Sequence, residues 1–207
     1  KDGPPDQAQF NGPFRLRVDA DGNVYVVDAN LAQMRGNHAI RRITPDGTVT
    51  TVAGTGKPGL ADGAAAEAGF YFPKGVAVDE AGNVYVTDSS TERIRVITPQ
   101  GMVYTLAGSG TTGHADGAGP EAAFFWLSGM ALDGAGRLYV TEAFSNRIRI
   151  IRLPQSLVAA PPSPTPDPYA GQKVIKIGFV AAPSFAYRSA AAMMGAQLAV
   201  DEANAAG

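Results

Sequence analysis

The 207-residue sequence contains no cysteine, only two histidines and a single tryptophan. The absence of cysteine excludes a disulfide framework, a thiolate metal site and a thiol nucleophile. The formal net charge of −2 provides no broad positive field for a phosphate backbone, so no nucleic-acid partner is expected. No apolar run reaches the roughly 20 residues of a membrane-spanning helix, so no membrane span is expected. Glycine and proline are plentiful, with 25 and 15 copies, which suits tight turns and a linker.

One pattern occurs three times along the chain. Val18–Asp28 reads VDADGNVYVVD, and Val78–Asp88 repeats it as VDEAGNVYVTD. Leu132–Glu142 is a more divergent third copy, LDGAGRLYVTE. The copies begin 60 and then 54 residues apart. A period of this size indicates an array of similar supersecondary units.

The second copy predicts four short strands within one period. They are rich in Val, Ile, Tyr and Thr and are separated by turn residues; their expected bounds are Gly75–Asp79, Asn83–Asp88, Arg93–Thr98 and Met102–Ala107. Four antiparallel strands per repeat are typical of a β-propeller blade. The first copy has an insertion expected to form a longer loop at Asn30–Asn37. The outer strand of the third copy is degenerate, at Leu157–Ala159.

Several features of the repeat resemble the NHL-repeat β-propeller family over residues 1–153. They are the Pro73–Asp79 entry, the Gly-Asn-Val-Tyr-Val-x-Asp hairpin, the Arg93–Ile97 strand and the Ala-Gly-x-Gly…Asp-Gly connection. The resemblance implies a mainly β fold, a partial propeller of about three four-stranded blades with a face suited to a protein or peptide partner. Three blades do not close a ring, so the chain is expected to be a fragment of a longer protein.

The remaining sequence changes character twice. Residues 154–172 are proline-rich and predict an extended linker. Residues 173–207 predict one strand followed by one helix, a truncated α/β unit. Ile175–Gly178 and Gly195–Gly207 resemble the start of type I periplasmic binding proteins, the branched-chain amino-acid receptors of ABC transporters. That resemblance implies an amino-acid-like solute and an extracytoplasmic location.

Candidate ligand-binding residues follow from the loop of this unit. Ser184, Phe185 and Tyr187 lie directly before the predicted helix. Backbone N–H groups and a hydroxyl at a helix N-terminus suit a ligand carboxylate. A plain capping loop is the alternative interpretation.

Charged residues of the repeats have structural and functional interpretations. Asp19–Asn23 faintly resembles a calcium loop, but it supplies too few oxygens and is interpreted as a hairpin turn. Asp88 with Arg93, and Glu142 with Arg147, are predicted to form ion pairs or hydrogen bonds that tie strand ends within a blade. The alternatives are an arginine-lined face for an anion or acidic peptide, and a local basic patch at Arg41 and Arg42.

Rare residue types supply the last candidates. His38 and His114 each occur in an irregular stretch and are interpreted as solvated loop residues; no metal site is assigned to them. Phe124, Phe125 and Trp126 are expected in the core between blades, with ligand binding on the propeller rim as the alternative.

The sequence supports three hypotheses about function. The leading one is a non-enzymatic, extracytoplasmic binding protein that needs no cofactor, in which a propeller platform is linked to a solute receptor. The second is a metal-dependent propeller lyase or lactonase, with residues converging on one propeller face. The third is a protein-interaction scaffold.

Overall fold

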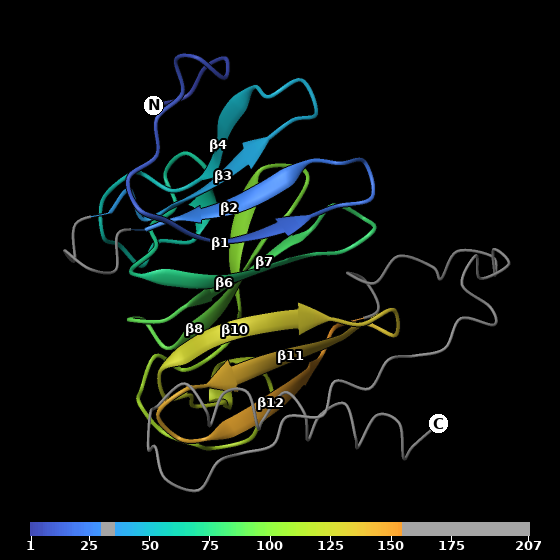
Figure 1. Cartoon of the computed structure of the whole chain (residues 1–207). Coiled ribbons are helices and arrows are strands. Elements are labelled where there is room, and N and C mark those ends of the chain that lie inside the picture. Colours follow the sequence, from blue (N-terminus) through green and yellow to red (C-terminus); the bar gives the residue numbers. More distant parts are fainter. Residues whose placement is uncertain (30–35, 155–207) are drawn as a thin grey trace, which may run out of the picture.

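The computed structural model describes residues 1–29 and 36–154, and the fold of this part is mainly β. Three antiparallel sheets follow the three repeats in order (Figure 1). The first contains β1 (Pro13–Val18), β2 (Val24–Asp28), β3 (Ala39–Ile43) and β4 (Val49–Ala53). The second contains β5 (Gly63–Ala64), β6 (Pro73–Val78), β7 (Val84–Asp88), β8 (Arg93–Ile97) and β9 (Met102–Ala107). The third follows a 3₁₀ turn, η1 (Gly119–Glu121), and contains β10 (Leu127–Leu132), β11 (Arg137–Glu142) and β12 (Arg147–Arg152). Within the described ranges, no helix is long and apolar enough to cross a membrane.

The predicted four-strand repeat is confirmed. In the second sheet the order β9-β8-β7-β6 runs from the outer to the inner edge, and the four bounds differ from the expected ones by at most two residues. The two-residue strand β5 was not predicted. It comes from the connection that precedes the blade and pairs with the outer edge of β9 through Gly63 and Val103. The same connection forms a single bridge, Gly3 to Val49, in the first blade.

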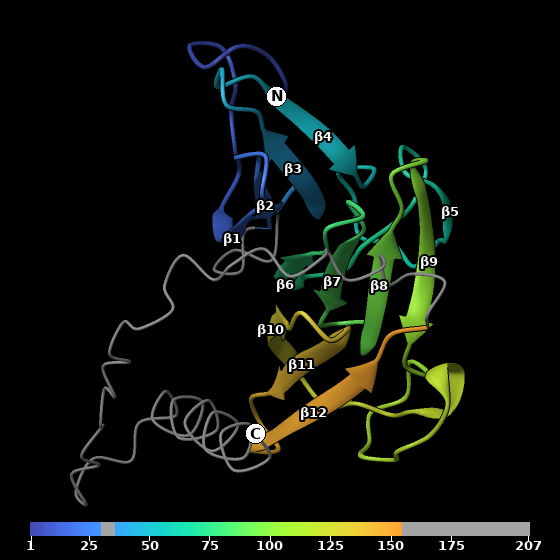
Figure 2. The same cartoon turned by 90° about the vertical axis from the view of Figure 1, so that its right-hand side faces the viewer.

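The three sheets stand side by side in an arc, as in part of a β-propeller. The inner strand β6 of the middle blade contacts β1 on one side and β10 on the other, while β4 and β9 lie on the outer side of the fan (Figure 2). Two apolar cores lie between successive blades, one around Phe70 and Val86 and one around Tyr85 and Phe124. Burial of these side chains between blades is the main favourable contribution to the arrangement.

Gly75 allows the inner strands of the second and third blades to approach closely. A Cβ atom at this position would lie 2.6 Å from the carbonyl oxygen of Ser128 and 2.9 Å from Oγ1 of Thr87. Thr87 Oγ1 also accepts a hydrogen bond from the Gly75 N–H and donates one to the Ser128 carbonyl. The Thr87 hydroxyl therefore links two blades at a point where a larger residue than glycine does not fit.

The two ends of the arc expose apolar side chains that are buried between blades elsewhere. Leu16 of β1 is exposed, whereas its counterpart Val76 is buried. Ile150 of β12 is likewise exposed, whereas its counterpart Val96 is buried. The outward surfaces of the first and third blades therefore have the apolar composition of an interface between blades.

Several predictions fall outside the described residues. These are most of the 30–37 loop, the degenerate outer strand at residues 157–159, all but the first residue of the 154–172 linker, and the α/β unit at residues 173–207 with Ser184, Phe185 and Tyr187. They stay predictions.

Candidate functional site

Each blade contains an arginine held between two acidic residues. In the second blade Arg95 is fully buried, and its Nη1 lies 3.3 Å from Oδ2 of Asp88. Its Nε donates to Oδ1 of Asp62, in the connection from the first blade, at 3.1 Å. Its remaining N–H groups reach the carbonyl oxygens of Ala61 and Gly69. The arginine thus fastens the connection to the blade that follows it.

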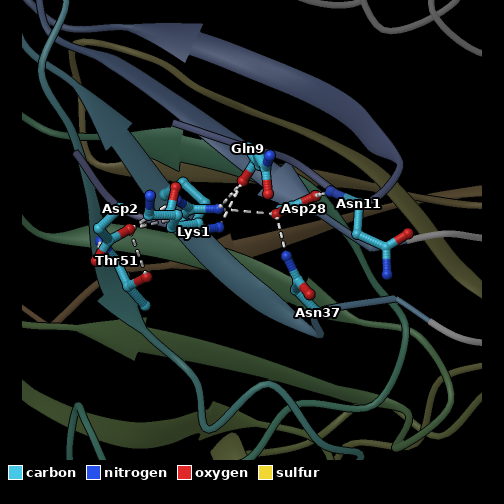
Figure 3. A network of polar contacts seen from close by, with 8 residues as sticks. Lys1, Asp2, Gln9, Asn11, Asp28, Asn37 and Thr51 are labelled. Atoms are coloured by element: carbon cyan, nitrogen blue, oxygen red, sulfur yellow. Dashed lines mark hydrogen bonds and ion pairs between the residues drawn. The ribbon is translucent and has the colours of Figure 1, made fainter. Parts of the chain in front are cut away.

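The other two blades repeat this acid–arginine–acid triad. Arg41 joins Asp2 to Asp28 in the first blade, and Figure 3 shows these two aspartates within their network of polar contacts. Arg149 joins Asp116 to Glu142 in the third. Each guanidinium also lies 5.0–5.3 Å from the centre of a phenylalanine ring; the three rings are Phe10, Phe70 and Phe124. Recurrence in all three blades indicates a role in the architecture of the repeat.

The triads correct the predicted ion pairs. Asp88 faces Arg93 across the β7–β8 ladder, yet its carboxylate binds Arg95, two residues further along the same face. Glu142 likewise binds Arg149 in place of Arg147. The reason is that Arg95 and Arg149 face the connection that precedes their blade, where they also bind Asp62 and Asp116. Arg41 is buried for the same reason, so Arg41 and Arg42 do not form an exposed basic patch.

The hairpin interpretation of Asp19–Asn23 is confirmed. One carboxylate oxygen of Asp19 accepts hydrogen bonds from the backbone N–H groups of Asp21 and Asn23, and the other accepts from the Asn23 side chain. Asp79 and Asp133 bind their own turns in the same manner. In the part of the chain that the structure describes, no group of three or more His, Cys, Asp or Glu side chains is arranged to hold a metal ion.

The two histidines lie in different environments. His38 is only 1% exposed, which corrects its assignment as a solvated residue. Burial lowers the pKa of His38, and its Nδ1 accepts a hydrogen bond from the Phe72 N–H of the next blade at 3.3 Å. His114 is partly exposed, and its Nδ1 lies 3.7 Å from Oε2 of Glu142. His38 therefore stabilises a junction between blades.

Four side chains from the second and third blades gather at one end of the sheets. Lys74 lies at the start of β6, Glu92 in the β7–β8 turn, Trp126 directly before β10 and Phe144 in the β11–β12 turn. We call these four residues the end-face patch. The inner strands and the third strands both begin at this end, which brings the four together. Trp126 is 38% exposed and Phe144 is 45% exposed.

Aromatic contacts organise the patch. The rings of Trp126 and Phe144 meet edge to face, with centroids 4.8 Å apart. The Lys74 ammonium lies 4.2 Å from the centroid of the Trp126 ring, a cation–π geometry. The expectation that Trp126 lies in the core is wrong, whereas Phe124 is buried as expected. The counterpart of Trp126, Phe72, has the same φ of 56° and is buried, so the exposure of Trp126 follows from its neighbours: its ring packs against Phe144 and Lys74 at the surface.

Glu92 is the buried acid of the patch. Its Oε1 accepts a hydrogen bond from the Trp126 N–H at 2.9 Å. Its Oε2 is buried and has no hydrogen-bond partner among the described residues. Burial raises the pKa of Glu92, although the N–H groups of Trp126 and Leu127 act in the opposite direction. An unsatisfied buried carboxylate oxygen is costly unless a further group binds it.

Lys74 is partly dehydrated. Burial lowers the pKa of the Lys74 ammonium to about 8; the Arg15 guanidinium also lowers it, and the Glu92 carboxylate raises it. The patch therefore combines an exposed aromatic surface, a weakly solvated cation and an incompletely bonded acid. Such a combination is typical of a binding or catalytic site.

Lys74 and Glu92 were not identified in the sequence. The sequence offered only a comparison between the repeats. Glu92 stands where the other two copies have His38 and Asn146, and Trp126 stands where they have Gly12 and Phe72. All of these positions have a positive φ. This backbone geometry belongs to the repeat, and only the side chains at its positions distinguish the patch.

Comparisons with known proteins agree with the repeat. The model of the teneurin NHL domain matches residues 58–123. The chloroplastic protein SUPPRESSOR OF QUENCHING 1 of Arabidopsis thaliana is 37% identical over 93 residues, which are 44% of this chain and 9% of that protein.

Two solved structures from Bacteroides thetaiotaomicron share the fold. One, a protein of unknown function, is 31% identical with a TM-score of 0.59 and is matched over 67% of this chain and 34% of its own length. The other, an auxiliary nutrient binding protein, is 27% identical with a TM-score of 0.57 and is matched over 66% and 36%.

The chain thus spans about a third of the length of these solved structures and less of the plant protein. The repeat, the blade topology and the matches lead to the same conclusion. Residues 58–123 match an NHL-type repeat domain, and the described part of the chain has a partial β-propeller-like fold.

Proposed function

We propose that this domain is a non-catalytic binding module, and that the end-face patch binds an organic ligand that combines a flat apolar group with a carboxylate. The exposed indole of Trp126 beneath the Lys74 ammonium carries this proposal. Trp126 and Phe144 offer the apolar contact. Lys74 offers a cation that has already lost part of its hydration, so pairing it with an anion costs less further desolvation.

Glu92 holds the backbone of Trp126 in place, because its Oε1 accepts a hydrogen bond from the Trp126 N–H. A carboxylate near Lys74 and a flat ring against the indole together describe an acylated aromatic amino acid or the carboxyl end of a peptide. The similarity to an auxiliary nutrient binding protein supports a binding role.

The wider hypothesis concerns residues 173–207. Their resemblance to amino-acid receptors supports a second module in an extracytoplasmic protein, whose complete α/β domain captures an amino-acid-like solute with Ser184, Phe185 and Tyr187. The patch then acts as a recognition platform beside that receptor. In a longer protein that contains the complete α/β domain, Tyr187→Ala is expected to abolish solute binding while the patch still binds its ligand.

An enzyme is the second candidate, and the pair Lys74 and Glu92 favours it. A lysine with a pKa near 8 and an acid with a raised pKa suit proton transfer at neutral pH. Turnover of a lactone or ester by the native chain, abolished in Lys74→Met without loss of folding, would favour this candidate over the binding module.

The test uses the single tryptophan of the chain, because Trp126 makes intrinsic fluorescence a direct reporter of the patch. We expect saturable quenching or a spectral shift with N-acetylphenylalanine. We expect much weaker effects with its amide, which lacks the carboxylate, and with acetate, which lacks the ring. Lys74→Met should abolish the response, and the exposed Lys57→Met should preserve it. An unchanged response in Lys74→Met would contradict the proposal.

A further inference from the structure

The outer edge of the third blade differs from the other two. In the first and second blades a fourth strand, β4 or β9, covers the third strand. Among residues 1–29 and 36–154, no strand pairs with the outer edge of β12. A groove of about 850 Å³ lies there instead, between β12 and the connection that contains Asp116 and Gly117. Leu106 and Phe124 contribute apolar surface to this groove.

In the second blade, the position that corresponds to this groove is occupied by the fourth strand. There β9 lies between β8 and β5, paired on both of its edges. Val103 pairs with Ile97 on one side and Gly63 on the other, and its side chain is fully buried. The corresponding residues in the third blade are Ile151 and Gly117, both of which line the groove. The groove is thus open along two backbone edges that match those around β9.

The triad aspartate supplies a polar contact to the fourth strand. Asp62 accepts hydrogen bonds from the N–H of Thr105 at 3.0 Å and from its hydroxyl at 3.3 Å. Asp2 accepts the same two from Thr51, at 2.9 and 3.0 Å. In the third blade the Asp116 carboxylate binds Arg149 but is 92% exposed. It is therefore positioned to accept the same two hydrogen bonds from an added strand.

We propose that β12 binds an extended segment of a second polypeptide with the pattern Val-x-Thr-aliphatic-Ala, which completes the blade by strand addition. This is the pattern of Val49–Ala53 and of Val103–Ala107. The valine fills the apolar groove, the threonine binds Asp116, and the backbone pairs with β12 and Gly117. The alanine occupies the position where Ala53 and Ala107 are buried.

The chain's own next segment departs from this pattern. By the repeat spacing its counterparts are Leu157, Ala159 and Pro161. Ala159 lacks the hydroxyl that Thr51 and Thr105 use, and Pro161 lacks a backbone N–H. A segment with the full pattern is therefore the better match for the groove.

The test measures binding of a fluorescein-labelled peptide that copies residues 101–108 to the whole chain by fluorescence anisotropy. We expect saturable binding that weakens about tenfold in Asp116→Ala, since hydrogen bonds to a charged group are lost. The exposed Glu121→Ala of the same connection should not change it. Replacing the peptide threonine by valine should weaken binding, and N-methylation of that threonine should abolish it.

Two results would overturn the proposal. One is binding that neither Asp116→Ala nor N-methylation reduces, because the peptide then does not add as a strand. The other is peptide binding that appears only when Leu157→Asp is introduced into the whole chain. In that case residues 157–159 of the native chain would occupy the groove and exclude the peptide.

Discussion

Replacing Arg95 by methionine should destabilise the chain strongly. Methionine keeps an unbranched, apolar side chain in the buried space but removes the guanidinium. At pH 8, where Asp88 is ionised, its carboxylate then remains fully buried without its cation, and the carbonyl oxygens of Ala61 and Gly69 lose their donors. Removing one partner of a buried ion pair costs about 3–5 kcal/mol. That is a large share of the roughly 5–15 kcal/mol that stabilises a typical domain.

The assay is urea unfolding followed by far-ultraviolet circular dichroism. Arg93→Met is the matched control, since Arg93 lies on the same strand and the same face but is only half-buried. The control should cost no more than about 1 kcal/mol, as for exposed pairs. In the double variant Asp88→Asn with Arg95→Met, the loss should be smaller than the sum of the two single losses, by about 1–3 kcal/mol. Equal losses for the Arg93 and Arg95 variants would refute the triad as the fastening between blade and connection.

Three further predictions follow from the packing and the titrating groups. Gly75→Ala should cost about 1–3 kcal/mol by crowding the Ser128 carbonyl, whereas Gly134→Ala, with open space around it, should be nearly neutral in the same urea assay. Burial raises the pKa of Asp88 to about 7, although the Tyr71 N–H and Arg95 oppose this; the folded chain then holds a proton that the unfolded chain releases. The free energy of unfolding should therefore fall as pH rises from about 4 to 7, and Asp88→Asn should remove this slope; an unchanged slope contradicts the assignment. Because the pKa of Lys74 is about 8, N-acetylphenylalanine should bind more weakly above pH 8. Lys74→Arg should abolish that decline, because arginine stays charged.

The strands and turns were predictable because their causes are local. The β-branched residues of Val84–Asp88 and the Asp79–Asn83 turn determine a hairpin within about ten residues. The turn carboxylate then binds its own backbone, so no distant partner is needed. Because the same sequence pattern occurs three times, each copy supported the prediction made for the other two.

Contacts between segments far apart in the sequence were harder to predict. Asp62 and Arg95 are 33 residues apart, and only the folded connection brings them together. A signal was nevertheless present: arginine occurs in all three copies at the position of Arg95, whereas Ala39 stands at that of Arg93. The residue present in every copy makes the repeated contact.

The burial of His38 and the exposure of Trp126 depend on the neighbouring blade. His38 is covered by Tyr71 and Phe72 across the junction, although its own surroundings in the sequence are polar. Trp126 adjoins two phenylalanines in the sequence, yet its ring packs against Lys74 and Phe144 at the surface. Residue type alone therefore gave the wrong environment for both.

Binding of a ligand with an apolar group and a carboxylate at the end-face patch can be observed by nuclear magnetic resonance. A chain with only Trp126 gives one indole N–H signal in a ¹H–¹⁵N correlation spectrum, so titration with N-acetylphenylalanine reads the patch directly. We expect a saturable shift of that signal in the native chain and in Lys57→Met, and none in Lys74→Met. A signal that stays fixed in the native chain, or moves equally in Lys74→Met, would contradict it.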